Sequence, residues 1–164
     1  MPLYQLDKKA NQAFFMKKIA IKYGIFMFLG FTALFLVMHE LAQVRNFNLR
    51  ILNGFIHIGL LYAAIREYRR DVMEQSGTVV SGVAAGMYTS IVGVLPFTIF
   101  IMFYLIADTP FMQHIKSSVP TGEYFNPFTA SLFILVEGIA ISLIGSYILD
   151  RLIDVNKSEA PGIR

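Results

Sequence analysis

Apolar residues gather in four long runs along the chain, and polar residues separate the runs. The runs cover residues 19–38, 51–68, 79–106 and 128–149. Each run approaches or exceeds the roughly 20 apolar residues that an α-helix needs to cross the hydrocarbon core of a bilayer. Backbone amides in lipid must be hydrogen-bonded within the segment, which favours helices. The pattern predicts an all-α fold, a four-helix transmembrane bundle formed by residues 1–164 as a single integral membrane domain.

The segments around the runs add detail to this prediction. The third run is long and has Pro96 near its middle, so we expect a long helix that is kinked there. The kink either marks a gate or lets a long helix fit the membrane. Residues 107–127 form the predicted outer loop, in which Phe111–Ile115 suggests a short amphipathic helix. Asp7 is a candidate N-cap for a helix that leads into the first run.

Lysine and arginine are distributed unevenly over the two sides that four spans create. Of the 14 cations, three lie on the side of the outer loop and the other eleven lie on the side of the two termini. The three are Arg45, Arg50 and Lys116, and the eleven are Lys8, Lys9, Lys17, Lys18, Lys22, Arg66, Arg69, Arg70, Arg151, Lys157 and Arg164. Cytoplasmic loops carry such an excess, so both termini are predicted to be cytoplasmic.

The composition fits a membrane protein and excludes several kinds of chemistry. Charged residues make up 15% of the chain and the mean hydropathy is +0.58. The net charge of +3 is explained by topology, so we expect the lipid bilayer and no nucleic acid as a partner. Lys17, Lys18, Arg69 and Arg70 are suited to contact anionic lipid. The chain has no cysteine, no catalytic motif and no cofactor or metal motif, so we expect neither an enzyme nor a cofactor.

Small residues recur at four-residue spacing in two of the runs. The third run contains Gly82, Gly86 and Ser90, and the fourth contains Gly138 and Ser142, followed by Ser146. Such stripes allow close contact between membrane helices. They indicate either packing inside the bundle or an interface with a second copy or a partner.

Ionisable side chains inside membrane segments are costly and suggest function. Glu137 and His57 lie at similar depths in the fourth and second runs, and Arg50, Asn53 and His57 form a polar stripe. Three interpretations remain open. His57 and Glu137 could exchange a proton, Glu137 could belong to a structural polar clamp, or Glu137 could face a partner subunit.

Several short stretches carry a resemblance. They are Lys22–Gly24, Ile65–Arg70, Asp108–Met112 and Gly138–Gly145, in this order. Together they resemble a family of small four-span membrane proteins found mainly in Bacteroidota, a domain of unknown function. The resemblance implies four spans and a bacterial inner membrane, and it implies no activity.

Two functions follow as hypotheses. The first is a small non-enzymatic inner-membrane protein, a structural or accessory component that self-associates or packs against a larger membrane complex. The second is a small transporter or channel-like protein that uses the intramembrane polar site of Glu137 and His57.

Overall fold

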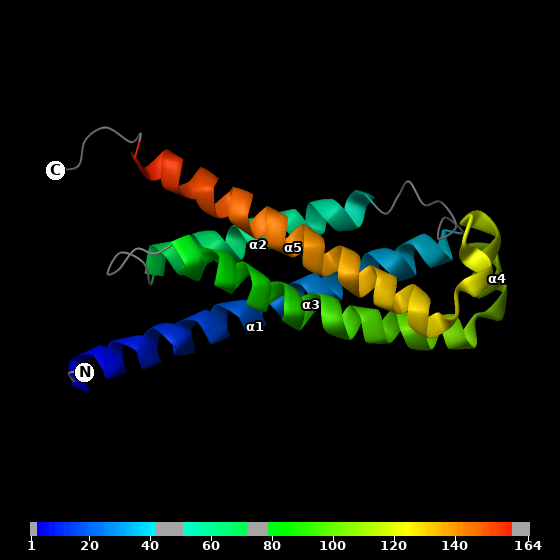
Figure 1. The fold of residues 1–164 in the computed structure, drawn as a ribbon, viewed down its shortest axis with the longest axis horizontal. Coiled ribbons are helices and arrows are strands. Elements are labelled where there is room, and N and C mark those ends of the chain that lie inside the picture. The colour runs from blue at the N-terminus through cyan, green and yellow to red at the C-terminus, as the bar shows by residue number, and fades with distance from the viewer. Residues whose placement is uncertain (1–2, 42–50, 72–78, 159–164) are drawn as a thin grey trace.

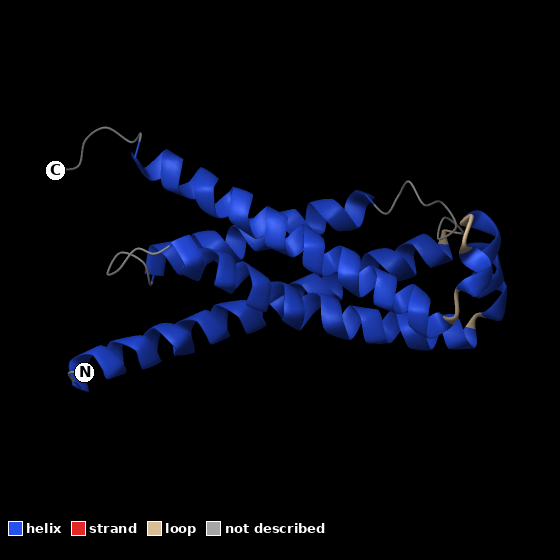
Figure 2. Ribbon diagram, in the orientation of Figure 1, coloured by secondary structure: helices blue, strands red, loops and turns tan. Residues whose placement is uncertain are grey.

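The computed structural model describes residues 3–41, 51–71 and 79–158 of the chain. Within these ranges the protein is helical and contains no strand (Figures 1 and 2). The elements in chain order are α1 (Leu3–Glu40), α2 (Ile51–Asp71), α3 (Val79–Ala107), α4 (Thr109–Ser118), the 3-10 helix η3 (Gly122–Tyr124) and α5 (Pro127–Ser158). The prediction of an all-α fold is therefore confirmed for the described residues.

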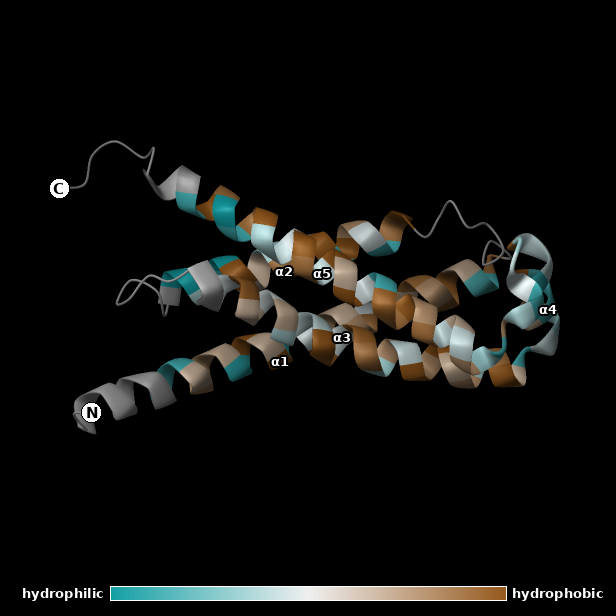
Figure 3. Cartoon of the chain, in the orientation of Figure 1, coloured by the Kyte–Doolittle hydropathy of each residue, from teal (hydrophilic) through white to brown (hydrophobic). Residues whose placement is uncertain are grey.

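Three of these helices are long and apolar enough to cross a membrane. The segments are Asn11–Glu40 in α1, Gly82–Ala107 in α3 and Pro127–Asp154 in α5. Figure 3 shows apolar residues along the middle of the helices and polar residues around α4. Helix α2 is less apolar, because Asn53 and His57 interrupt it and charged residues fill its last turns. The structure thus supports a membrane protein, and a crossing by α2 stays a prediction.

The four long helices pack side by side. Helix α1 contacts α2 and α3, α5 contacts the same two helices, and α2 also contacts α3. Figure 1 shows the start of α1 and the end of α5 at one end of the molecule, with α4 at the other. Helices α2 and α3 therefore lie between α1 and α5 and contact both of them.

The helices extend beyond the predicted apolar runs. Helix α1 begins at Leu3, so Asp7 lies inside it and the predicted N-cap at Asp7 is wrong. Helix α5 continues past Leu149 to Ser158, and α2 continues to Asp71. Hydropathy detects only the lipid-compatible part of a helix, whereas backbone hydrogen bonds continue into the polar flanks. Helix α3 runs without a break through Pro96, and the kink stays a prediction.

The predicted outer loop contains the short helix that its sequence suggests. This helix, α4, is longer than expected and starts directly after Asp108. The Asp108 carboxylate caps it by accepting a hydrogen bond from the Phe111 amide, with 2.9 Å between N and Oδ1. Pro110 fits the first turn, where no amide donor is needed. Phe111 and Met112 are buried, which attaches α4 to the end of the bundle.

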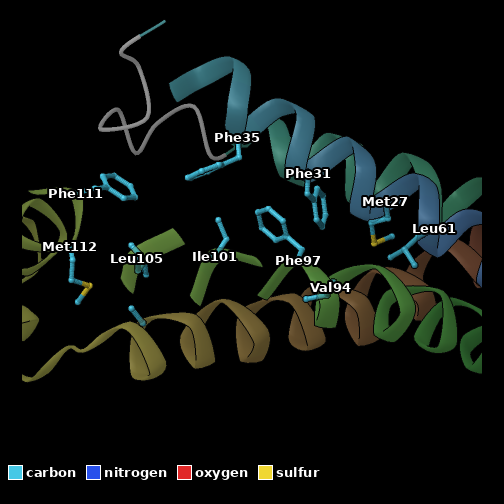
Figure 4. Packing of buried hydrophobic residues seen from close by; sticks show 11 residues of the cluster. Met27, Phe31, Phe35, Leu61, Val94, Phe97, Ile101, Leu105, Phe111 and Met112 are labelled. Atoms are coloured by element: carbon cyan, nitrogen blue, oxygen red, sulfur yellow. The ribbon is translucent and has the colours of Figure 1, made fainter. Parts of the chain in front are cut away.

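Large apolar side chains fill the half of the bundle nearest α4, as Figure 4 shows. The rings of Phe35 and Tyr104 have centroids 4.7 Å apart, and those of Phe31 and Phe97 are 5.2 Å apart. We call this region the aromatic half. Its rings belong to Phe31, Phe35, Phe97, Phe100, Tyr104 and Phe111.

Candidate functional site

His57 lies in the interior where the aromatic half ends. Its side chain is 3% exposed, and its ring packs edge-on against Phe31. Nε2 lies 2.9 Å from Ser142 Oγ and 3.2 Å from Ser90 Oγ. The Ser142 hydroxyl donates to the Gly138 carbonyl, so its oxygen accepts from the imidazole, which assigns a proton to Nε2. Helices α2, α3 and α5 are therefore linked by hydrogen bonds at one level.

A cavity of about 300 Å³ adjoins His57 and is walled by α1, α2, α3 and α5. Its polar lining comes from Asn53, His57 and Glu137, and apolar residues supply the rest. The structure thus brings the predicted pair His57 and Glu137 to one cavity, although the imidazole Nε2 binds Ser90 and Ser142. Asn53 Oδ1 is buried and has no hydrogen-bond donor among the described residues. Arg50 lies outside the described residues.

The two stripes of small residues face each other inside the chain. A Cβ atom on Gly82 would collide with the Asp150 carboxylate, and one on Gly86 would collide with the Ser146 side chain. At the other end of the stripe, a Cβ on Gly138 would lie 2.6 Å from Val94 Cγ1. Both stripes are consequently used for packing between α3 and α5, which favours the first of the two interpretations of their spacing.

An ion cluster that the sequence pattern did not predict lies beyond these small residues. Arg69 of α2 is 5% exposed and donates from Nε to Asp150 Oδ1 at 2.6 Å. Its two terminal nitrogens bind Asp154, with 3.0 Å between Nη2 and Oδ2. The predicted lipid contact of Arg69 is therefore wrong, because its guanidinium is committed to carboxylates inside the protein. A bidentate guanidinium–carboxylate pair of this kind is directional as well as strong.

A sequence signal for the ion cluster does exist. The four-residue spacing of Gly138, Ser142 and Ser146 continues through Asp150 and Asp154. Residues four apart are neighbours on one face of a helix, so the small residues and the two acids share a strip of α5. Asp150 lies just past the end of the predicted fourth run, where an acidic residue looks solvent-exposed.

Several buried polar side chains, with the half-buried Asp154 at the end, form a row from the cavity to the end of the bundle that holds the start of α1. We call this row the polar column. It consists of His57, Ser90, Ser142, Ser146, Asp150, Arg69 and Asp154. Ser146 Oγ and Asp150 Oδ2 are buried without a hydrogen-bond partner in the described part of the chain. Hydroxyl and imidazole groups both donate and accept hydrogen bonds, so the bonded part of the column, formed by His57, Ser90 and Ser142, is chemically suited to proton movement.

Two further polar contacts join helices nearer the surface. Glu67 of α2 accepts from Lys22 at 2.8 Å and from the Tyr23 hydroxyl at 2.6 Å, which ties α1 to α2. At the opposite end, the Tyr104 hydroxyl lies 2.8 Å from Asp108 Oδ2 and 2.9 Å from His39 Nδ1. These contacts connect neighbouring helices at the two ends of the bundle, and they lie outside the polar column.

Across the described ranges, no three His, Asp or Glu side chains converge as metal ligands would. No family model, curated protein or solved structure matches the chain significantly. The interior geometry is accordingly the basis for an inference about function.

Proposed function

We propose that this protein is a small inner-membrane transport protein that moves protons through the interior of its helix bundle. The cavity beside Asn53, His57 and Glu137 forms one end of the route, and the polar column forms the rest. The observation that carries the proposal is the row of buried polar side chains, one helical turn apart on α5, that leads from Ser142 beside the cavity through Ser146 to Asp150 and the Arg69 cluster. A bundle that serves only as a scaffold in lipid has no need of a buried polar atom that lacks a partner among the described residues, such as Ser146 Oγ, because such an atom is costly there.

The proposed topology has four spans, with both termini in the cytoplasm of a bacterial cell. Its support is the excess of cations near the start of α1 and the ends of α2 and α5, together with the contacts of α2 with all three apolar helices. If only α1, α3 and α5 cross the membrane, α4 lies on the same side of the membrane as the start of α1.

Single-cysteine labelling distinguishes these topologies, and the natural chain contains no cysteine to interfere. Asn11→Cys and Ser117→Cys place one thiol at an exposed site at each end of the bundle. With four spans, a membrane-impermeant maleimide labels only Ser117→Cys in intact spheroplasts, and Asn11→Cys reacts only after lysis. Equal behaviour of the two variants would contradict four spans.

Assembly with itself or with a larger membrane complex is less well supported. The small-residue stripes that suggested an interface are buried between α3 and α5. A partner must therefore contact the outward, apolar surface of the helices, on which Phe103 and Phe133 are examples of exposed side chains. Purification in mild detergent with mass spectrometry of co-purifying proteins tests this alternative.

Proton flux into liposomes tests the main proposal. Purified protein is reconstituted with a pH-sensitive dye inside the vesicles, and a potassium diffusion potential drives the flux. We expect acidification or alkalinisation, according to the sign of the potential, to be faster than in protein-free vesicles. His57→Gln keeps a hydrogen-bond donor but cannot relay a proton, so the rate is expected to fall by about tenfold or more.

His114→Gln is the matched control, because His114 lies on α4 and outside the polar column. Its flux is expected to equal that of the natural protein. Flux no faster than in protein-free vesicles would contradict proton transport by this protein. Equal flux in His57→Gln and the natural protein would contradict the route through the polar column.

A further inference from the structure

The cavity of about 300 Å³ has both an exposed rim and a buried floor. Ile51 of α2 and Glu137 of α5 line it and are exposed. Phe31, Val94 and Phe97 line it and are buried. The cavity is therefore a pocket that a ligand can enter between α2 and α5, and its volume lies at the lower end of the range for small-molecule sites.

The polar lining of this pocket presents acceptor oxygens. Asn53 Oδ1 is buried and has no hydrogen-bond donor among the described residues. Glu137 adds its carboxyl oxygens at the rim, and the imidazole Nε2 of His57 is directed at Ser90 and Ser142. A buried acceptor without a donor is costly, so a ligand that brings N–H groups to this lining gains affinity.

The remaining lining is apolar and partly aromatic. The ring centroids of Phe31 and Phe97 are 5.2 Å apart, and Ile134 and Ile141 of α5 contribute aliphatic surface. Such walls fit an apolar ligand body. The described lining contains no lysine or arginine, the side chains that hold a phosphate, so it favours an apolar amine over the amine headgroup of a phospholipid.

We infer that the cavity is a binding site for a small apolar amine. The N–H groups of the ligand donate to Asn53 Oδ1 and to the Glu137 carboxyl group, and its hydrocarbon part lies against Phe31 and Phe97. The inference goes beyond the proposed function, because binding of an amine in this cavity requires no movement of protons.

Equilibrium dialysis of the full chain in phosphatidylcholine nanodiscs tests the inference, with empty nanodiscs as the reference. The probe is naphthylmethylamine, which is detected by its fluorescence. The matched ligand is ethylnaphthalene, in which a methyl group replaces the amine and no donor remains. We expect the amine to bind saturably and about tenfold more tightly than ethylnaphthalene, because only the amine donates to the acceptors of the lining.

Two variants locate the site. Asn53→Leu removes the buried acceptor and is expected to weaken amine binding by about tenfold without weakening ethylnaphthalene binding. Gly54→Leu is expected to abolish binding of both ligands, because Gly54 lines the cavity and no atom lies within 4 Å of an added Cβ. Gly59→Leu is the control, since Gly59 also has no atom within 4 Å of an added Cβ and lies outside the lining. Its affinities are expected to equal those of the natural protein.

Absence of saturable binding, equal affinities for the two ligands, or an unchanged amine affinity in Gly54→Leu would overturn the inference. Gly54→Leu decides the location even if Asn53→Leu does not fold, because its side chain enters open space. Displacement of the probe by added phosphatidylethanolamine would assign the site to a lipid headgroup and overturn the choice of a free amine. Binding without proton flux rejects proton transport alone, and flux without binding rejects the amine site alone.

Discussion

The two halves of the bundle hold the same helices together in different ways. In the aromatic half, interlocking rings such as those of Phe35 and Tyr104 separate the helices and fill the interior. In the other half, Gly82 and Gly86 let α3 approach α5, and the interior contains hydroxyls, carboxylates and a guanidinium. His57 lies at the border, with its ring against Phe31 and Nε2 on Ser142.

The difference shows which forces are available to helices in a bilayer. Lipid tails solvate apolar side chains as well as another helix does, so association depends on packing contacts and hydrogen bonds. The aromatic half relies on the contact area of large rings. The polar half relies on close backbone approach and on paired polar groups, which also makes it the half suited to chemistry.

The largest expected effect comes from removing the cation of the polar half. Arg69→Ala leaves Asp150 and Asp154 without their shared partner, and we expect the free energy of unfolding to fall by about 3–5 kcal/mol. Unfolding in mixed detergent and SDS measures the change. Lys22→Ala removes an exposed cation from the pair with Glu67 and is expected to change stability far less. Similar losses in the two variants would contradict the distinction between the buried cluster and the surface pair.

Gly86→Leu tests the close approach of α3 and α5. The new side chain collides with Ser146 and comes near Ile65, so we expect a loss of up to about 3 kcal/mol. Gly59→Ala is the control, because no atom lies within 4 Å of the added Cβ. Alanine is the better helix former, so this control is expected to retain or raise stability. A tolerated leucine at position 86 would contradict the packing described for this half.

Phe35→Ala tests the aromatic half. Phe35 packs against the rings of Phe100, Tyr104 and Phe111, and its removal leaves a cavity. We expect a loss of about 2 kcal/mol, less than the roughly 3–5 kcal/mol of a water-soluble core, because lipid also solvates the lost ring. Phe103→Ala, at an exposed ring, should leave the thermal midpoint nearly unchanged. A larger loss in the free energy of unfolding than Arg69→Ala causes would show that the aromatic half, and not the polar half, contributes more to stability.

Tyr104→Phe is expected to have the smallest effect. It removes only the hydroxyl that bridges His39 and Asp108, and a net hydrogen bond contributes about 1 kcal/mol. The ring contacts with Phe35 and Phe111 remain. Thermal unfolding with Tyr124→Phe, a change at an exposed tyrosine, as the control measures the difference. A loss comparable to that of Phe35→Ala would show that the hydroxyl, and not the ring, holds this end together.

The helical architecture was largely predictable because apolar runs of membrane length leave few alternatives. Helix α4 was also predictable from a short amphipathic segment after Asp-Thr-Pro. The helix ends were not, since α1 and α5 continue through polar residues that hydropathy treats as loops. Hydropathy also describes α2 poorly. Asn53 and His57 reduce the hydropathy of this helix, although it packs against the other three long helices.

The site was only partly predictable. Matching depths placed His57 and Glu137 at one level, and the structure shows both lining one cavity. The partners of His57 depend on which helices are neighbours, and spacing within a single helix does not contain that information. Arg69 was interpreted as a surface cation because it lies among other charges, whereas the partners that bury it are 81 and 85 residues away along the chain.

The strip of α5 from Gly138 to Asp154 limits where residues can be inserted into this chain or deleted from it. Each residue turns an α-helix by about 100°, so steps of four residues advance the strip by about 40° each time. The strip thereby turns gradually from Val94 on α3 to Arg69 on α2. One residue inserted between Ser142 and Ser146 would rotate every later position by about 100° and move Asp150 away from its partner. We therefore expect an insertion or deletion within this strip of α5 to disrupt the packing more than a substitution at one of the exposed positions of the helix.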